Sequence, residues 1–148
     1  MNIVIVSHPS RINYVERLVN HLPITTTVID TVSALSGHRM ALRLALACKG
    51  RTIIMEDDAI PVVDFERKAQ EWFDHYPHDL LSFYLGTSRP RDLQPMVDER
   101  VRIADEQGRR QLQMPTLMHG VCYSIPEHDL PKIVQRLEQR GNNIREAD

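Results

Sequence analysis

The sequence predicts an α/β fold in which a mostly parallel sheet is flanked by helices. Apolar runs rich in β-branched residues occupy residues 2–7, 25–30 and 51–55, and segments with helical spacing of apolar residues lie between them. Strands that alternate with helices in this way are typical of parallel sheets. The chain has 148 residues and contains no repeat, low-complexity tract or linker, so we expect one domain over residues 1–148.

The first part of the chain is expected to supply three strands and two helices. In chain order these are a strand at 2–7, a helix at 12–22, a strand at 25–30, a helix at 35–49 and a strand at 51–55. Ser10 is the expected N-cap of the first helix, and Gly50 ends the second. The third strand runs directly into three carboxylates, residues 56–58.

The rest of the chain is expected to be less regular. The expected elements are a helix capped by Asp64, a strand at 80–85, a long loop at 87–116 with traces of a hairpin at 100–104 and 111–114, a strand at 117–123 and a final helix. The final helix is expected to begin at a capping box in residues 124–127. Pro131 would either kink this helix or separate its first turn from a main helix capped by Asp129. Long polar loops are usually functional, so we expect residues 87–115 to form a mobile lid.

Composition excludes several classes of protein. The net charge of −2 argues against a protein whose main role is to coat nucleic acid, because that binding depends on a basic surface. The sequence has no apolar run of about 20 residues and no export signal at its amino end. Cys48 and Cys122 lack metal-site spacing and are expected to be reduced thiols, which favours a soluble cytoplasmic protein.

Three consecutive carboxylates form the clearest chemical feature. In open parallel sheets, ligands bind beyond the carboxyl ends of the strands, where Glu56, Asp57 and Asp58 are expected to lie. Alternation along an extended chain directs Glu56 and Asp58 to one side and Asp57 to the other. Glu56 and Asp58 would then form an oxygen-rich site for Mg²⁺ or Mn²⁺. The alternative is that the three carboxylates cap the following turn and face water.

The second helix carries a polar stripe beside its apolar face. Ser36, Arg39 and Arg43 recur at helical spacing, and an anion such as a diphosphate would offset the repulsion between the two arginines. His38 is a candidate for hydrogen bonding to a ligand. A solvated surface and a structural histidine are the respective alternatives.

Two further strand ends carry candidate ligand-binding groups. Between Ser7 and Arg11 the chain passes from a strand to the start of a helix, where backbone N–H groups favour an anion and Arg11 adds a guanidinium. Asp30 ends the second strand and is suited to hydrogen bonds from a ribose or base. The sequence contains no GxGxxG motif of a Rossmann dehydrogenase and no GxxxxGK[ST] motif of a P-loop enzyme. It also lacks the GxSxG and HExxH motifs that are typical of serine and zinc hydrolases.

Several segments in order resemble a known family. These are residues 33–43 (SALSGHRMALR), 52–59 (TIIMEDDA), 64–65, 78–87 (HDLLSFYLGT) and 119–125 (HGVCYSI). In order and spacing they resemble the bacterial lipopolysaccharide-type glycosyltransferases, a family related to collagen galactosyltransferase domains. The sequence departs from the family pattern at Gly37, which is inserted before His38.

The resemblance implies a GT-A-like fold and assigns roles to the candidate residues. Glu56 and Asp58 would hold Mn²⁺ or Mg²⁺ on the diphosphate of a nucleoside-diphosphate sugar. The implied donor-binding residues are Ser7, Arg11, Asp30, Ser36, His38, Arg39, Arg43 and Asp57. Gly86, Thr87 and His119 would lie on the acceptor side. The last residue, Asp148, falls about where the family has an acidic segment that supplies acceptor binding or the base, so it is the candidate catalytic residue unless further chain or another group completes the site.

The expected function is metal-dependent transfer of a sugar from a nucleoside-diphosphate sugar to an acceptor that the sequence does not identify. The acceptor classes left open are a glycan, a lipid-linked sugar, a protein and a modified nucleic acid, and the oligomeric state is open as well. Two alternatives remain. One is a non-catalytic module that binds a nucleotide or sugar nucleotide, and the other is a metal-dependent phosphohydrolase or nuclease that uses the same carboxylates.

Overall fold

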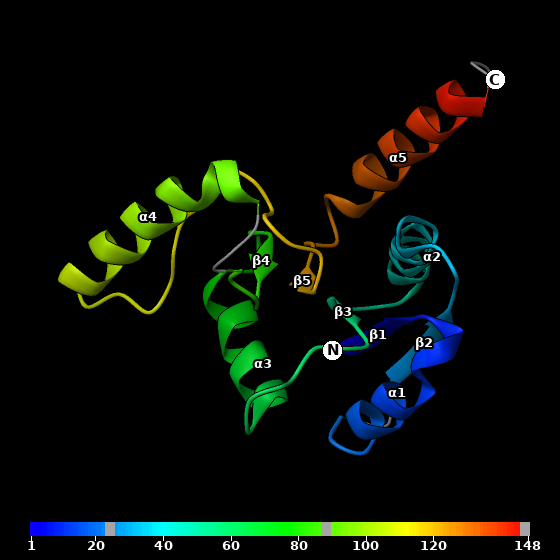
Figure 1. Ribbon diagram of the computed structural model, residues 1–148, viewed down its shortest axis with the longest axis horizontal. Coiled ribbons are helices and arrows are strands. Elements are labelled where there is room, and N and C mark those ends of the chain that lie inside the picture. The colour runs from blue at the N-terminus through cyan, green and yellow to red at the C-terminus, as the bar shows by residue number, and fades with distance from the viewer. Residues whose placement is uncertain (23–25, 87–89, 146–148) are drawn as a thin grey trace.

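A computed structural model describes residues 1–22, 26–86 and 90–145, without the side chains of residues 26, 30 and 140–145. The chain forms an α/β fold around a five-stranded sheet, as expected (Figure 1). The strands are β1 (Asn2–Ser7), β2 (Thr26–Asp30), β3 (Thr52–Glu56), β4 (Leu81–Ser82) and β5 (Cys122–Ser124). The helices are α1 (Ile12–Val19), α2 (Ala34–Ala47), α3 (Phe65–His75), α4 (Gln94–Glu106) and α5 (Leu130–Arg145), with short 3₁₀ turns η1 (Pro9–Arg11) and η2 (Arg91–Leu93).

The sheet is mixed, with strand order β2-β1-β3-β5-β4. β1 is parallel to β2 and to β3, whereas β5 is antiparallel to both β3 and β4. The expectation of a mostly parallel sheet is therefore correct for β1, β2 and β3 and wrong for β5. Because β5 runs against β3, its amino end lies beside the carboxyl end of β3, where the Glu56 N–H donates to the Val121 carbonyl over 2.8 Å.

Both faces of the central strands are buried, which explains their continuous apolar runs. Val4, Val6 and Ile54 pack with α2 and α5 on one face. Ile3, Ile5, Ile53 and Met55 point to the opposite face, where they pack with residues of α1 and α3. Figure 1 shows α2 and α5 on one side of the strands and α1 and α3 on the other. Within the described residues, no helix is long and apolar enough to cross a membrane.

The segment after β4 differs from the sequence-based expectation. Residues 94–106 form helix α4, not a loop with a hairpin, and Val97 and Ala104 are buried on it. Pro95 lies in the first turn of α4, where a proline costs no hydrogen bond and is compatible with the start of a helix. The expected strands at 80–85 and 117–123 are shorter in the structure. β4 ends where the Ser82 hydroxyl donates to the Tyr84 carbonyl over 2.9 Å.

Helix starts were predicted with mixed success. Ser10 does not cap α1, because it lies inside η1, where its N–H donates to Nδ1 of His8 over 3.2 Å. Asp64 precedes α3 in the left-handed region (φ 58°) and makes no capping hydrogen bond with its side chain. The alternative of a separate main helix after Asp129 is correct, since α5 begins at Leu130.

Candidate functional site

The three carboxylates after β3 separate into one buried and two partly exposed groups. Asp57 is 3% exposed, and its Oδ2 accepts hydrogen bonds from the Ser7 hydroxyl and the His8 N–H, each over 3.1 Å. Its Oδ1 accepts from Arg11 over 2.9 Å. Asp57 therefore holds residues 7–11 against the end of β3. Residues 57 and 58 form a turn after β3 and do not continue its extended chain, so strand alternation does not extend to Asp58. We call this group, Ser7, His8, Arg11 and Asp57, the Asp57 clamp.

Arg11 links the clamp to the third carboxylate. The same guanidinium nitrogen that contacts Asp57 lies 3.4 Å from Oδ2 of Asp58, whose side chain is 49% exposed. The hydrogen bond to Asp57 and the charges of both aspartates raise the pKa of Arg11. Arg11 was expected to bind a donor phosphate. In the structure its guanidinium contacts these two carboxylates.

Glu56 belongs to a second hydrogen-bonded group. Its Oε1 lies 3.2 Å from Nε2 of His38 on α2, and Nδ1 of His38 lies 3.1 Å from the Tyr123 hydroxyl on β5. An ionised carboxylate only accepts, so Nε2 carries the proton in this contact, and Nδ1 of a neutral imidazole then accepts from Tyr123. Burial, together with the nearby charge of Glu56, raises the pKa of Tyr123 and keeps its hydroxyl protonated.

Two glycines allow these groups to approach one another. A Cβ at Gly120 would lie 3.3 Å from Cε1 of His38 and 3.7 Å from Oε1 of Glu56. A Cβ at Gly37 would collide with the side chains of Val6 and Thr31. Gly37 is the residue that departs from the family spacing, and here it allows α2 to pack closely on β1 and to bring His38 to Glu56.

The polar stripe of α2 does not act as one group. Arg43 is exposed and contacts Glu138 on α5, with its Nε 3.0 Å from Oε1. Ser36 is exposed, and its N–H donates to the Ser33 hydroxyl over 3.4 Å at the start of the helix. Nε of Arg39 is buried and has no hydrogen-bond partner within the described residues. Arg43 therefore pairs with a residue of α5, whereas Nε of Arg39 has no such partner in the described part of the chain. Of the two arginines, Arg39 is the better candidate for donor binding.

Gly86 and His119, two of the three predicted acceptor-side residues, meet beside β4 and β5. Gly86 is buried so closely against His119 that a Cβ would collide with the imidazole ring. Tyr84 packs edge-to-face on the same ring, with centroids 5.3 Å apart, and Nε2 of His119 is buried without a partner in the described part of the chain. Thr87 and Asp148 lie outside the described residues.

Asp30 is described by its backbone alone. It ends β2 and is paired in register with Ser7 at the end of β1. The predicted role of its side chain therefore stays a prediction, at a position beside the Asp57 clamp.

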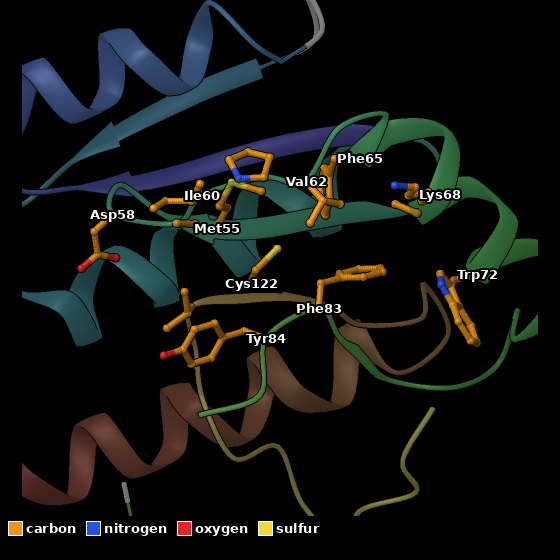
Figure 2. Close-up of a pocket in the computed structure, with 14 residues that line it drawn as sticks. Met55, Asp58, Ile60, Val62, Phe65, Lys68, Trp72, Phe83, Tyr84 and Cys122 are labelled. Carbon is orange, nitrogen blue, oxygen red and sulfur yellow. The ribbon is translucent and has the colours of Figure 1, made fainter. Parts of the chain in front are cut away.

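An apolar cavity of about 460 Å³ adjoins Asp58 and was not predicted from the sequence. β3, α3 and residues 59–62, 83–84 and 121–122 line it (Figure 2). Phe65, Ala69 and Trp72 form an apolar stripe on α3 that the sequence presents as ordinary core. In the sequence, the apolar residues 59–63 that follow the carboxylates are a signal for this cavity.

Glu56 and Asp58 remain the predicted metal ligands. Within residues 1–22, 26–86 and 90–145, no cluster of three or more His, Cys, Asp or Glu side chains is arranged to hold a metal ion. Glu56 uses Oε1 for His38 and Asp58 uses Oδ2 for Arg11, so these contacts leave the other oxygen of each carboxylate for a ligand. Comparisons of the chain with known protein families, curated proteins and solved structures found no match.

Proposed function

We propose that this protein is a metal-dependent glycosyltransferase that uses a nucleoside-diphosphate sugar. The observation that carries the proposal is the pair of partly exposed carboxylates at the carboxyl end of β3. The side chains of Glu56 and Asp58 are 33% and 49% exposed, whereas Asp57, which stands between them in the sequence, is buried. Ligands of α/β sheets bind at this edge of the sheet, and a diphosphate with its cation needs such oxygen ligands.

The side chains present are compatible with a cation that is shared with the donor. Mg²⁺ and related ions are commonly bound through one or two carboxylates together with substrate phosphates. Glu56 and Asp58 supply that number, and each has one oxygen outside the contacts described above. When bound, the cation neutralises negative charge on the departing nucleoside diphosphate.

The other residues of the site orient these carboxylates. His38 donates to Glu56, and the Tyr123 hydroxyl fixes the imidazole from its other nitrogen, so Glu56 has one preferred direction. Arg11 limits the repulsion between Asp57 and Asp58, and its side chain is 47% exposed, which leaves guanidinium nitrogens for a donor phosphate.

Isothermal titration calorimetry with a panel of nucleoside-diphosphate sugars, with and without Mn²⁺, tests the proposal. We expect one donor to bind in Mn²⁺ and to be hydrolysed slowly in the absence of an acceptor. Asp58→Asn should abolish the Mn²⁺-dependent binding, because a ligand charge is lost. Asp98→Asn, at an exposed position on α4, is the matched control and should bind like the parent.

Assays of hydrolysis and transfer with the same panel, and with simple phosphate esters, separate the alternatives. Donor binding without hydrolysis or transfer to any acceptor would favour a non-catalytic binding module. Mn²⁺-dependent cleavage of simple phosphate esters, with no preference for a sugar nucleotide, would favour a phosphohydrolase. The glycosyltransferase proposal fails if no sugar nucleotide binds in Mn²⁺ or if Asp58→Asn binds the donor as tightly as the parent.

A further inference from the structure

The cavity beside Asp58 has the size of a small-molecule site and mostly apolar walls. Its volume of about 460 Å³ lies within the roughly 300–1,000 Å³ that is usual for ligand pockets. Figure 2 shows Met55, Phe83 and Cys122 between the two ends of the cavity. Burial raises the pKa of the Cys122 thiol to about 12, so this wall stays uncharged at neutral pH. The interior is therefore suited to an aliphatic or aromatic group.

The two ends of the cavity differ in polarity. Figure 2 shows Asp58 at one end, with Tyr84 on the same side, and Trp72 at the other end beside Lys68. The Lys68 ammonium donates to the Val63 carbonyl over 2.8 Å, which engages it with the protein itself. Asp58 is half-exposed, and its carboxylate can accept hydrogen bonds from hydroxyl groups of a ligand at this end. A ligand that fits both ends has a hydroxylated head and an apolar body.

The rim of the cavity is unusually apolar for a surface segment. Ile60 is 89% exposed and Val63 is 80% exposed, in the segment between the carboxylates and α3. Ile60 also lines the cavity, so the exposed apolar surface continues into the interior. Exposed apolar surface that is continuous with a cavity is typical of a place where an apolar ligand binds.

The polar end of the cavity adjoins the residues predicted on the acceptor side. Tyr84 lines the cavity and packs on His119, which in turn lies against Gly86. We propose that the cavity binds an amphiphilic acceptor, with its hydroxylated head at Asp58 and Tyr84 and its aliphatic or aromatic body along the cavity toward Trp72. That the amphiphile is an acceptor rests on the proposed glycosyltransferase function, whereas its binding does not.

Trp72 provides a direct measurement of binding, because it is the single tryptophan of the chain and lines the far end of the cavity. We would titrate the protein with n-octyl β-glucoside below its critical micelle concentration and record tryptophan fluorescence. Methyl β-glucoside, which has the same head and no tail, is the matched ligand control. We expect a saturable change with a stoichiometry of one for the octyl compound and no change for the methyl compound.

Two variants connect the signal to the cavity. Ile60→Gln removes apolar surface from the rim and should weaken octyl glucoside binding roughly tenfold. Val32→Gln is the matched control, because Val32 is similarly exposed but lies before α2, and it should bind like the parent. The proposal is overturned if octyl and methyl glucosides act alike, if the change does not saturate, or if Ile60→Gln binds as tightly as Val32→Gln.

Failure of this proposal is distinguishable from failure of the proposed function. If octyl glucoside saturates the Trp72 signal but no sugar nucleotide binds in Mn²⁺, the amphiphile site is supported and the transferase is not. If a donor binds in Mn²⁺ and Trp72 does not respond, the donor site is supported and the amphiphile site is rejected. Transfer of sugar to octyl glucoside, and not to methyl glucoside, would support both.

Discussion

Asp57 and Asp58 are neighbours in the sequence, but they belong to two different regions of the molecule. Asp57 is buried and accepts three hydrogen bonds from Ser7, His8 and Arg11, all within the protein. Asp58 is half-exposed, has one long contact with Arg11 and lines the apolar cavity. The comparison indicates that a run of carboxylates at a strand end can combine a structural clamp with an open site, so residue type alone does not assign function.

The largest effect is expected where the Asp57 clamp is broken. Asp57→Ala removes the acceptor for the buried Ser7 hydroxyl and the His8 N–H, and should lower the free energy of unfolding by about 2–3 kcal/mol. Asp58→Ala should change it by about 0.5 kcal/mol or less, because that carboxylate faces water. Urea denaturation of the two variants measures both values. Equal losses of stability would contradict the division between clamp and open site.

A somewhat smaller effect is expected where α2 supports the open site. Gly37→Ala forces a Cβ against Val6 and Thr31 and should lower stability by about 1–3 kcal/mol while moving His38 away from Glu56. The NMR chemical shifts of the His38 imidazole would report the lost contact. A variant as stable as the parent, with unchanged His38 shifts, would show that α2 does not depend on this close packing.

The cavity wall should produce a dependence of stability on alkaline pH. Burial raises the pKa of Cys122 from its ordinary 9.0 to about 12, so the folded protein keeps a proton that the unfolded chain releases. Its contribution is present below pH 9 and is lost as pH rises from about 9 to 12. Cys122→Ala should make the fall in unfolding free energy over this window shallower, by up to about 1.4 kcal/mol per pH unit. Urea denaturation at pH 8, 9.5 and 10.5 tests this, and slopes equal to those of the parent would contradict it.

The smallest effect is expected at Arg43, which lies apart from both regions compared above. Its contact with Glu138 is exposed, so Arg43→Lys should change stability by about 0.5 kcal/mol or less and leave donor affinity unchanged. Arg11→Lys, in contrast, should weaken donor binding, because it removes a guanidinium that bridges the carboxylates. A clear loss of donor affinity in Arg43→Lys would restore the sequence-based role of this residue.

Much of the first part of the fold follows from local sequence. β1, β2 and β3 and their connecting helices have clear periodicity and turn signals. Alternation does not carry past Glu56, because β3 ends there and residues 57 and 58 form a turn. α4 was missed because residues 87–116 were interpreted as a long polar loop, although the proline of this helix lies in its first turn, where it is tolerated. β4 has two residues, too few for any periodic pattern.

The partners of the candidate residues were less predictable than the residues themselves. His38 and Tyr123 are 85 residues apart in the sequence, and Arg43 and Glu138 are 95 apart, so no local pattern connects either pair. The direction of β5, which brings Gly120 and Val121 to Glu56, is set by long-range pairing with β3 and β4. The cavity escaped prediction for the same reason, because segments distant in the sequence form its walls.

We propose that Asp58 holds a cation for a diphosphate, whereas the buried Asp57 stabilises the fold through its contacts with Ser7, His8 and Arg11. Electron paramagnetic resonance of Mn²⁺ in the presence of the donor's nucleoside diphosphate tests it most directly, with the isosteric variants Asp57→Asn and Asp58→Asn compared with the parent. Asp58→Asn should be as stable as the parent and should bind no Mn²⁺ beyond what the nucleotide binds alone. Asp57→Asn should be less stable than the parent. Protein-bound Mn²⁺ in Asp58→Asn at the parent's level would contradict the account.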